Sequence, residues 1–497
     1  MSMMEQALFA FDNTYARLPD RFFQSLPPTP VSEPGLIRFN GGLAQELGLA
    51  VDALTSREAI EVFAGNRVPA GAEPLAMAYA GFQFGNWVPR LGDGRAILLG
   101  EVMGRDGQRR DIQLKGAGPT PFSRRGDGRA ALGSVLREYA VSEAMAALGI
   151  PTTRSLAAVT TGDWVARESR LPGAVLTRVA RSHIRVGTFQ YFEGREDVDA
   201  LRLLADHVIA RQGLESLEPA DRYRDLLRAV VRGQAELVAR WQLVGFIHGV
   251  MNTDNASVSG ETIDYGPCAF MDGYDPEKVY SSIDARGRYA YCNQPGIANW
   301  NIAGFAQSLL PLLATDRDEA VAIANEAIGD FAERFEEAYL AGARRKLGLL
   351  EASADDATLM ADLLDVMAAN DADFTLTFRR LSEVERTAGE TDAALRQGLR
   401  EPDALAPWLA RWRARLGEEL ASDGDRAAAM RAVNPAYIPR NHLVEEAIRS
   451  AVDSGDFGPF DRLVDVVTAP FDEASGDERH AAPPRPDQVV HQTFCGT

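Results

Sequence analysis

The sequence predicts an α+β fold with two lobes, a β-rich lobe followed by a larger helical lobe. Residues 81–190 consist mainly of short apolar or alternating segments separated by turns, with one helix among them. Residues 191–470 contain long segments whose apolar residues recur at helical spacing, as in amphipathic helices. Residues 1–80 are predicted to form an N-terminal extension packed on this core. Residues 471–497, rich in Pro, Asp and Glu, are predicted to be a mobile C-terminal tail.

Strands in the first lobe are predicted from alternation and from turn signals. Arg95–Val102 is an apolar run, and Arg110–Lys115 alternates, with Ile112 and Leu114 on one face. Asp106-Gly107 lies between these two segments and is a hairpin signal. Three further strands are expected, with a turn at Gly162-Asp163, at Ser155–Thr160, Trp164–Ala166 and Ala174–Ala180.

Helices are predicted by the same periodicity and by their end signals. The helix of the first lobe is expected over Gly128–Leu148, because Gly149 and then Pro151 would end it. The expected helices of the second lobe are Ala220–Val244, Asp316–Leu349, Ala357–Asn370 and Pro402–Glu419. An irregular island, His248–Asn301, interrupts them. This order of elements is the layout of protein kinases, so a protein-kinase-like two-lobed fold is expected.

Composition and charge exclude several classes of protein. The chain has 497 residues and a formal charge of −19, and such an acidic balance argues against a general nucleic-acid binder, which needs a positive surface. Arginines nevertheless crowd the stretch from Arg90 to Arg185, which suggests a pocket for a small anion. Three cysteines, no secretory signal and no membrane-length apolar run lead us to expect a cytoplasmic protein without membrane contact. We expect a monomer.

The irregular island carries the clearest chemical motif. His248-Gly-Val-Met-Asn-Thr-Asp-Asn255 is followed nine residues later by Asp264-Tyr-Gly. Kinases have H-R-D-L-x-x-x-N followed by D-F-G, in which the Asn and the second Asp bind metal. Mg²⁺ prefers hard oxygen ligands of this kind. The motif therefore predicts metal ligands at Asn255 and Asp264.

One position of this motif departs from kinases. Val250 stands where a kinase has its catalytic aspartate, and valine cannot accept a proton or orient a hydroxyl. Ordinary transfer of the γ-phosphate is therefore doubtful. Asp254 is the nearest carboxylate that could act as a base.

The β-rich lobe supplies cations and a glycine-containing turn. Lys115 ends a predicted strand and can reach phosphate oxygens, and Glu138 in the following helix can pair with it. Glu143 is a second candidate for that pairing. The sequence Gly92-Asp-Gly-Arg95 matches the kinase glycine loop incompletely, and glycines there would let the backbone approach phosphates.

A second loop of the same lobe is rich in glycine and arginine. Residues 116–129 run into the predicted helix, and a helix N-terminus flanked by arginines suits a phosphate. Arg178 and Arg185 would add two fixed cations. We expect the phosphates to meet more positive charge on the small-lobe side than in an ordinary kinase.

Taken together, these motifs resemble those of the selenoprotein O family of kinase-fold protein adenylyltransferases. The stretches that carry the resemblance are Tyr79–Gly85, Leu91–Arg95, Gln113–Arg125, His248–Asn255 and Asp264–Pro267. The similarity extends along most of the chain and is weakest over residues 314–426. It implies transfer of AMP from ATP to Ser, Thr or Tyr hydroxyls of proteins, with release of pyrophosphate and with ATP flipped relative to kinases.

The resemblance also assigns roles to individual residues. The family's nucleotide contacts match Gly92, Gly94, Arg95, Lys115, Asp127, Gly128, Arg178 and Arg185. Glu138 matches the glutamate that pairs with the lysine. Asp254 matches the proton acceptor. Asn255 and Asp264 match the ligands of Mg²⁺ or Mn²⁺.

The resemblance further suggests redox control through the C-terminus. Some family members carry selenocysteine at the position of Cys495, and a thiol there could form a disulfide with the catalytic lobe. Residues 279–282 have no cysteine where some relatives offer one. Cys292 and Cys268 remain as partners, and Cys268 is expected to be buried. A Cys292–Cys495 disulfide is our hypothesis.

Two other functions compatible with these residues remain open. One is a γ-phosphotransferase that uses Asp254 as its base. The other is a non-catalytic ATP-binding scaffold, because the kinase aspartate is missing. Comparing label transfer from α- and γ-labelled ATP would distinguish AMP transfer from phosphotransfer, and for a scaffold Asp264→Ala should leave cellular function intact.

Overall fold

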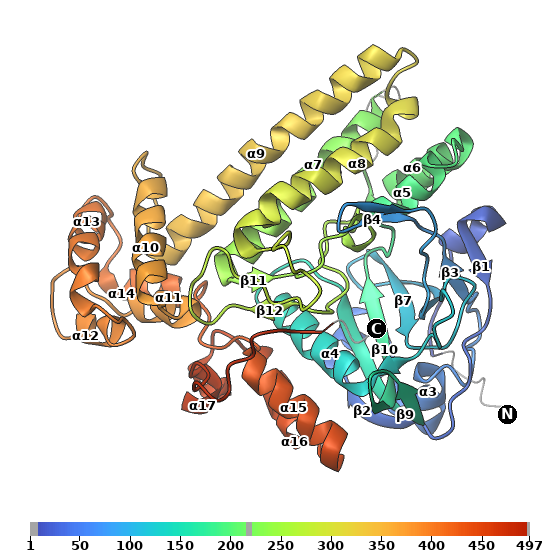
Figure 1. The fold of residues 1–497 in the computed structure, drawn as a ribbon, viewed down its shortest axis with the longest axis horizontal. Helices are drawn as coiled ribbons and strands as arrows, with labels where there is room; N and C mark the ends of the chain where they lie inside the picture. The colour runs from blue at the N-terminus through green and yellow to red at the C-terminus, as the bar shows by residue number, and fades with distance from the viewer. Residues whose placement is uncertain (1–7, 215–220, 495–497) are drawn as a thin grey trace.

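An antiparallel sheet occupies one end of the molecule (Figure 1). The computed structural model describes residues 8–214 and 221–494. The strands follow the order β1-β3-β6-β7-β10-β9-β2, and the short β8 pairs with β10. Their bounds are β1 Phe23–Ser25, β2 Gly35–Phe39, β3 Leu75–Met77, β6 Ala96–Met103, β7 Arg109–Lys115, β8 Ala130–Ala131, β9 Arg154–Ala166 and β10 Arg170–Ala180.

The N-terminal region contributes directly to this sheet. Strands β1 and β3 extend it beyond β6, and β2 pairs with β9 at the other edge. Three short helices, α1 Gly41–Glu46, α2 Val51–Leu54 and α3 Arg57–Phe63, follow β2. Their apolar residues pack with those of β6, β7 and β9 in one core cluster. The boundary that we place at residue 80 therefore stays a prediction.

The predicted hairpin of β6 and β7 is confirmed, and Gly107 in its turn has a φ of 72°. The polar side chains that alternate along β7 do not face solvent. Asp111, Gln113 and Lys115 are all buried, because β7 lies in the middle of the sheet and both of its faces are covered. These polar groups are paired within the protein: Asp111 accepts hydrogen bonds from Arg211 and His183.

Two strand predictions need correction. We expect separate strands around a turn at Gly162-Asp163, but β9 runs without a break from Arg154 to Ala166. The pairing of β9 with β10 shifts register between Pro172 and Ala174, and this irregularity accommodates Gly162 with its φ of 74°. A bulge, rather than a chain reversal, explains the glycine.

Helix α4, Leu132–Ala147, lies between the sheet and two C-terminal helices (Figure 1). It starts later than we predict, because residues 130–131 form β8 with β10. The C-terminal helices are α15 Asn441–Ser454 and α16 Gly458–Val467. Tyr139 of α4 meets Phe460 of α16, with ring centroids 5.8 Å apart. Burial on both sides explains why most α4 residues are inaccessible to solvent.

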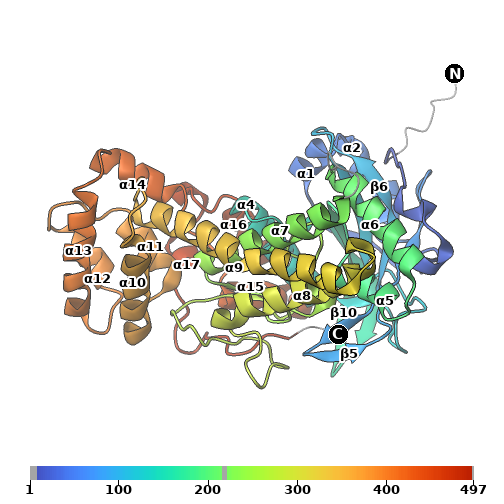
Figure 2. The ribbon, with the colours of Figure 1, turned by 90° about the horizontal axis from the view of Figure 1, so that it is seen from above.

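The second part of the molecule is helical, as predicted. Figures 1 and 2 show three long helices side by side, namely α7 Arg222–Val244, α8 Gln294–Leu313 and α9 Arg317–Leu347. The shorter helices α5 Val186–Glu193 and α6 Val198–Gln212 connect them to the sheet.

A cluster of shorter helices lies at the end of the molecule far from the sheet (Figure 2). These helices are α10 Asp356–Asn370, α11 Phe374–Leu381, α12 Thr391–Arg396, α13 Ala406–Leu416 and α14 Asp423–Arg431. They enclose Trp408 and Trp412, whose rings stack 5.9 Å apart. The helix that we predict over Pro402–Glu419 begins as a 3-10 turn, Pro402–Leu405, and continues as α13.

The irregular island that we predict is shorter than expected. Strands β11 Phe246–Ile247 and β12 Ala269–Phe270 pair at its base, and a 3-10 turn covers Thr253–Asn255. Its end at Asn301 is wrong, because α8 already begins at Gln294. Helix α8 contains no charged residue, so no charged face marks it as an amphipathic helix in the sequence.

The predicted C-terminal tail contacts the body of the molecule along its described part. A short helix, α17 Glu478–Ala481, is followed by an extended segment. Thr493 is buried, and its backbone bonds to Tyr280 and Ser282. Cys268 is buried and Cys292 is exposed, but Cys495 lies outside the described residues. The proposed disulfide and the tail boundary at residue 471 therefore stay predictions.

The sequence analysis predicts no membrane contact, and the helices of the structure can be compared with that prediction. None of the helices in the described ranges combines the length and apolar composition that a membrane-spanning helix requires.

Candidate active site

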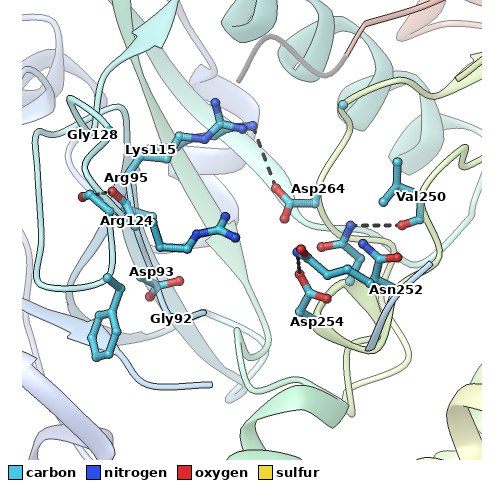
Figure 3. Close-up of a pocket in the computed structure, with 18 of the residues that line it drawn as sticks. Gly92, Asp93, Arg95, Lys115, Arg124, Gly128, Val250, Asn252, Asp254 and Asp264 are labelled. Atoms are coloured by element: carbon cyan, nitrogen blue, oxygen red, sulfur yellow. Dashed lines mark hydrogen bonds and ion pairs between the residues drawn. The ribbon is translucent and has the colours of Figure 1, made fainter. Parts of the chain in front are cut away.

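A cavity of about 600 Å³ lies between the sheet and the irregular island that follows β11. Figure 3 shows Arg95 and Lys115 on one side of it and Asp254 and Asp264 on the other. The predicted site residues that line it are Gly92, Gly94, Arg95, Lys115, Asp127, Gly128, Arg178, Arg185, Asp254, Asn255 and Asp264. Glu138, the remaining one, is buried in α4 directly behind Lys115. Residues separated by up to 172 positions are thus brought into one site.

Four charged groups form a network at the centre of the site. Glu138 accepts hydrogen bonds from Lys115 and from the Arg178 Nε. Arg178 also donates to the Asp264 Oδ1 over 2.7 Å, and the Lys115 Nζ lies 3.9 Å from the same oxygen. Burial raises the pKa of Glu138, but the two cations outweigh it and hold the pKa below its usual value. Glu138 is therefore ionised and fixes both cations.

Glu143, the second candidate for pairing with Lys115, has a different partner. Glu143 lies on α4 away from the cavity and pairs with Arg154, with 2.8 Å between Oε2 and Nη2. The same carboxylate accepts the backbone N–H of Ser155. The structure therefore settles the pairing of Lys115 in favour of Glu138.

Asp264 is held by the charges around it and by its backbone. Its φ is 66°, a left-handed conformation that is uncommon for residues other than glycine and is found at functional sites. Burial raises the pKa of the carboxyl, but Arg178, Lys115 and Arg185 hold it well below its usual range. Asp264 is consequently an anion at any physiological pH.

Arg185 connects the sheet side of the cavity to the catalytic loop. Its Nη1 donates to the Tyr79 hydroxyl and to the Asp254 carbonyl, each over 3.1 Å. It also lies 3.7 Å from Asp93 and from Asp264. The sequence analysis does not single out Asp93, although this buried carboxylate accepts the Met77 N–H over 3.1 Å. Its position between Gly92 and Gly94 could have identified it as part of the site.

The two glycine-containing loops contact each other. A Cβ at Gly92 would lie 2.3 Å from the Phe122 ring, and one at Gly128 would lie 2.1 Å from Gly118. The Thr120 hydroxyl donates to the Asp93 carbonyl over 2.7 Å. Packing of loop against loop, in addition to any approach of phosphate, therefore requires glycine here.

Hydrogen bonds hold the motif His248–Asn255, which we call the catalytic loop, in place. The His248 Nε2 donates to the Ile263 carbonyl over 2.9 Å, which ties the loop to the residue before Asp264. The Asn255 amide nitrogen donates to the Val250 carbonyl over 3.0 Å, which fixes the orientation of the amide group. His248 thus has a structural role, and Val250 holds Asn255 through its backbone.

A hairpin that the sequence analysis did not identify holds the catalytic loop. Strands β4 Gly81–Gln83 and β5 Asn86–Val88 form it. The Phe82 N–H donates to the Thr253 hydroxyl over 2.8 Å, and the Phe84 N–H donates to the Asn252 amide oxygen over 3.0 Å. The available signal was the stretch Tyr79–Gly85, which we used only for the family resemblance.

Gln83, which lies between Phe82 and Phe84 in the hairpin, forms a hydrogen bond with Asp254, the candidate base. Its amide nitrogen donates to the Asp254 Oδ2 over 3.2 Å, whereas the buried Oδ1 has no hydrogen-bond partner among the described residues. A Cβ at Gly81 would lie 2.7 Å from Oδ1, so only glycine fits beside it. Burial raises the pKa of Asp254 to about 6. Such a carboxyl can exchange a proton near neutral pH.

These groups define a class of site. A deep cavity with fixed Lys and Arg on one wall, and with two carboxylates and an amide oxygen on the other, has the charges expected for a phosphate-bearing ligand.

Comparison with known proteins agrees with this class. The family model described as "Protein adenylyltransferase SelO" matches residues 6–468, and the chain belongs to this family. A "Protein nucleotidyltransferase YdiU" of Rhodopseudomonas palustris is 61% identical over 489 residues, 98% of this chain and 99% of the relative. A protein of the same name from Methylorubrum extorquens is 60% identical over 496 residues, 99% of this chain and all of the relative. The prediction of an enzyme of the nucleotidyltransferase class is thereby confirmed.

Proposed function

We propose that this enzyme transfers AMP from ATP to Ser, Thr or Tyr hydroxyls of proteins and releases pyrophosphate. The family description and the relatives' names support nucleotidyl transfer to proteins. One observation carries the proposal: Val250 replaces the kinase aspartate, while buried cations gather on the sheet side of the cavity. The fold that we propose is the kinase-like one, with residues 81–190 as the small lobe and 191–470 as the helical lobe.

The cations support a flipped orientation of ATP. Lys115, Arg178 and Arg185 are each at most 3% exposed and are held by Glu138, Asp264 and Tyr79. Fixed cations neutralise phosphate best where they need no reorganisation. The β- and γ-phosphates would therefore lie against the sheet side, and the α-phosphate would face Asp254. Gly92, Gly94, Arg95, Asp127 and Gly128 would contact the nucleotide from the two loops.

Asn255 and Asp264 suit a divalent cation, Mg²⁺ or Mn²⁺. In the described ranges no three His, Cys, Asp or Glu side chains group as a metal site, so these two residues and phosphate oxygens would hold the ion. The amide oxygen of Asn255 and the ionised Asp264 are hard donors, as such ions prefer. The ion would supply charge neutralisation at the phosphates.

Asp254 is the proposed general base. Gln83 would orient this carboxylate through its hydrogen bond to Oδ2, and the carboxylate would accept the proton of the acceptor hydroxyl. The hydroxyl oxygen then bonds to the α-phosphorus as the bond from that phosphorus to the bridging oxygen breaks. Pyrophosphate leaves with the bonding electrons, and Lys115, Arg178 and Arg185 take up its charge.

Paired labelling tests the proposal. The enzyme is incubated with Mg²⁺ or Mn²⁺, a soluble protein extract and either α-³²P-ATP or γ-³²P-ATP. Protein label from the α position alone is expected, and its rate should fall about 100- to 10,000-fold in Asp254→Asn, as for the loss of a general base, while ATP affinity is retained. Label from the γ position alone would instead establish phosphoryl transfer. Absence of both labels, with ATP bound, would indicate a scaffold.

A further inference from the structure

The outer side of the β4–β5 hairpin carries an unusual group of exposed side chains. Trp87 on β5 is 38% exposed, and Trp300 on α8 is 39% exposed. The Phe82 ring lies between them, with centroids 5.0 Å from Trp87 and 5.4 Å from Trp300. The half-buried Arg288 places its guanidinium carbon over the Trp300 ring, 5.0 Å from the ring centroid.

Helix α8 extends this surface with an uncharged stripe. Its exposed residues recur on one face of the helix, at Gly296, Trp300, Ala303, Gln307 and Pro311. The helix has no charged residue among its 20, although a quarter of the chain is charged. An ordinary solvent-facing helix side carries charges. We call the outer hairpin, Arg288 and this stripe the hairpin–α8 surface.

The composition of the hairpin–α8 surface is that of a protein-binding site. Trp and Arg are the residue types most enriched at the energetic centres of protein interfaces. Interface cores are also depleted of charged residues. Both features occur here together.

The hairpin–α8 surface is continuous with the active-site cavity. Gln83 and Phe84 of the same hairpin line that cavity, and Gln83 bonds to Asp254. A polypeptide lying on the outer hairpin would therefore pass beside the base. A small acceptor molecule would not need such a surface, whereas a protein acceptor would.

We propose that the hairpin–α8 surface docks the acceptor protein, which rests on the proposed function above. The occupant is a segment of the acceptor that carries its hydroxyl next to apolar side chains and an acidic one. The apolar side chains would cover Trp87 and Trp300, and the acidic one would pair with Arg288. Docking there would bring the hydroxyl to the cavity mouth near Asp254.

The test compares exposed tryptophans in two places. Trp87→Ala and Trp300→Ala are combined in one variant, and Trp164→Ala is the matched control, since Trp164 on β9 is 59% exposed and lies outside the surface. Each full-length enzyme receives α-³²P-ATP, metal and increasing amounts of a soluble protein extract. The double variant should label extract proteins about tenfold more slowly or worse at low extract, with recovery at high extract. Its ATP affinity, by calorimetry, should equal that of the control.

A second variant separates docking from misfolding. Ala303→Glu adds a charge to the exposed stripe without removing any packing, and Ala341→Glu does the same at an exposed alanine of α9. Only Ala303→Glu should slow labelling, at an unchanged melting temperature.

The outcomes that overturn the proposal are distinct from failure of the function. Equal labelling by all variants would refute acceptor docking while leaving AMP transfer intact. A wild-type dimer that becomes monomeric in the double variant, with labelling unchanged, would assign the surface to a second copy of the chain. Absence of α-label with the wild-type enzyme would instead refute the proposed function itself.

Discussion

Replacing Gln83 with leucine removes the hydrogen bond to Asp254 while roughly keeping side-chain volume. The bond joins an amide nitrogen to a carboxylate oxygen over 3.2 Å, the long end of the normal range. A hydrogen bond to a charged group contributes about 1.5–3 kcal/mol, and the length favours the lower value. Since about 1.4 kcal/mol corresponds to a tenfold change in rate, the proposed AMP transfer should slow roughly tenfold as Asp254, the proposed base, loses its fixed orientation.

The assay is the initial rate of protein labelling from α-³²P-ATP, with ATP affinity measured separately by calorimetry. Affinity should stay unchanged, because Gln83 approaches the base rather than the cations. Asn86→Ala is the control, as its exposed side chain lies on the same hairpin and makes no bond to the catalytic loop. In an Asp254→Asn background Gln83→Leu should add nothing, because the two residues act through one contact. A full additional tenfold loss in that background would refute the reasoning.

Three further substitutions test the charged and buried groups. Glu138→Gln leaves Lys115 and Arg178 buried without their shared anion. It should therefore lower the free energy of unfolding, measured by denaturant titration, by about 3–5 kcal/mol and weaken ATP binding. The control Glu143→Gln should destabilise α4 yet leave ATP affinity intact. For Asp264→Asn, the rise in melting temperature that ATP produces should no longer depend on added Mg²⁺, whereas a persistent metal effect would exclude Asp264 as a ligand. Burial lowers the pKa of Lys346 to about 7. Its unfolded pKa is about 10.4, so the unfolded state binds more protons between these values, and Lys346 should contribute a rise in stability of roughly 3 kcal/mol from pH 6 to pH 9. Lys346→Met should abolish that rise, and an identical pH profile in the variant would contradict it.

Local patterns in the sequence were sufficient for much of the secondary structure. The β6–β7 hairpin and helices α7, α9 and α10 follow from alternation, helical periodicity and end signals. Helix α8 could not be delimited in this way, because it has no charged face. The break that we expect in β9 also fails, since strand pairing with β10 overrides the local turn preference of Gly162.

The sequence by itself determined the chemistry-bearing motifs, because their residues are close together along the chain. His248, Asn255 and Asp264 are recognisable from spacing alone, and so is Val250 at the position of the kinase aspartate. Which side chains approach these residues from elsewhere could not be read in this way.

Only the tertiary structure decided the long-range pairs of the site. Glu138 rather than Glu143 faces Lys115, Arg178 meets Asp264, and Gln83 bonds to Asp254 across 171 positions. Each of these pairs depends on how the sheet, α4 and the catalytic loop pack together. Local propensity carries no information about such packing, so the orientation of Asp254 and the outer face of the β4–β5 hairpin became visible only in the folded chain.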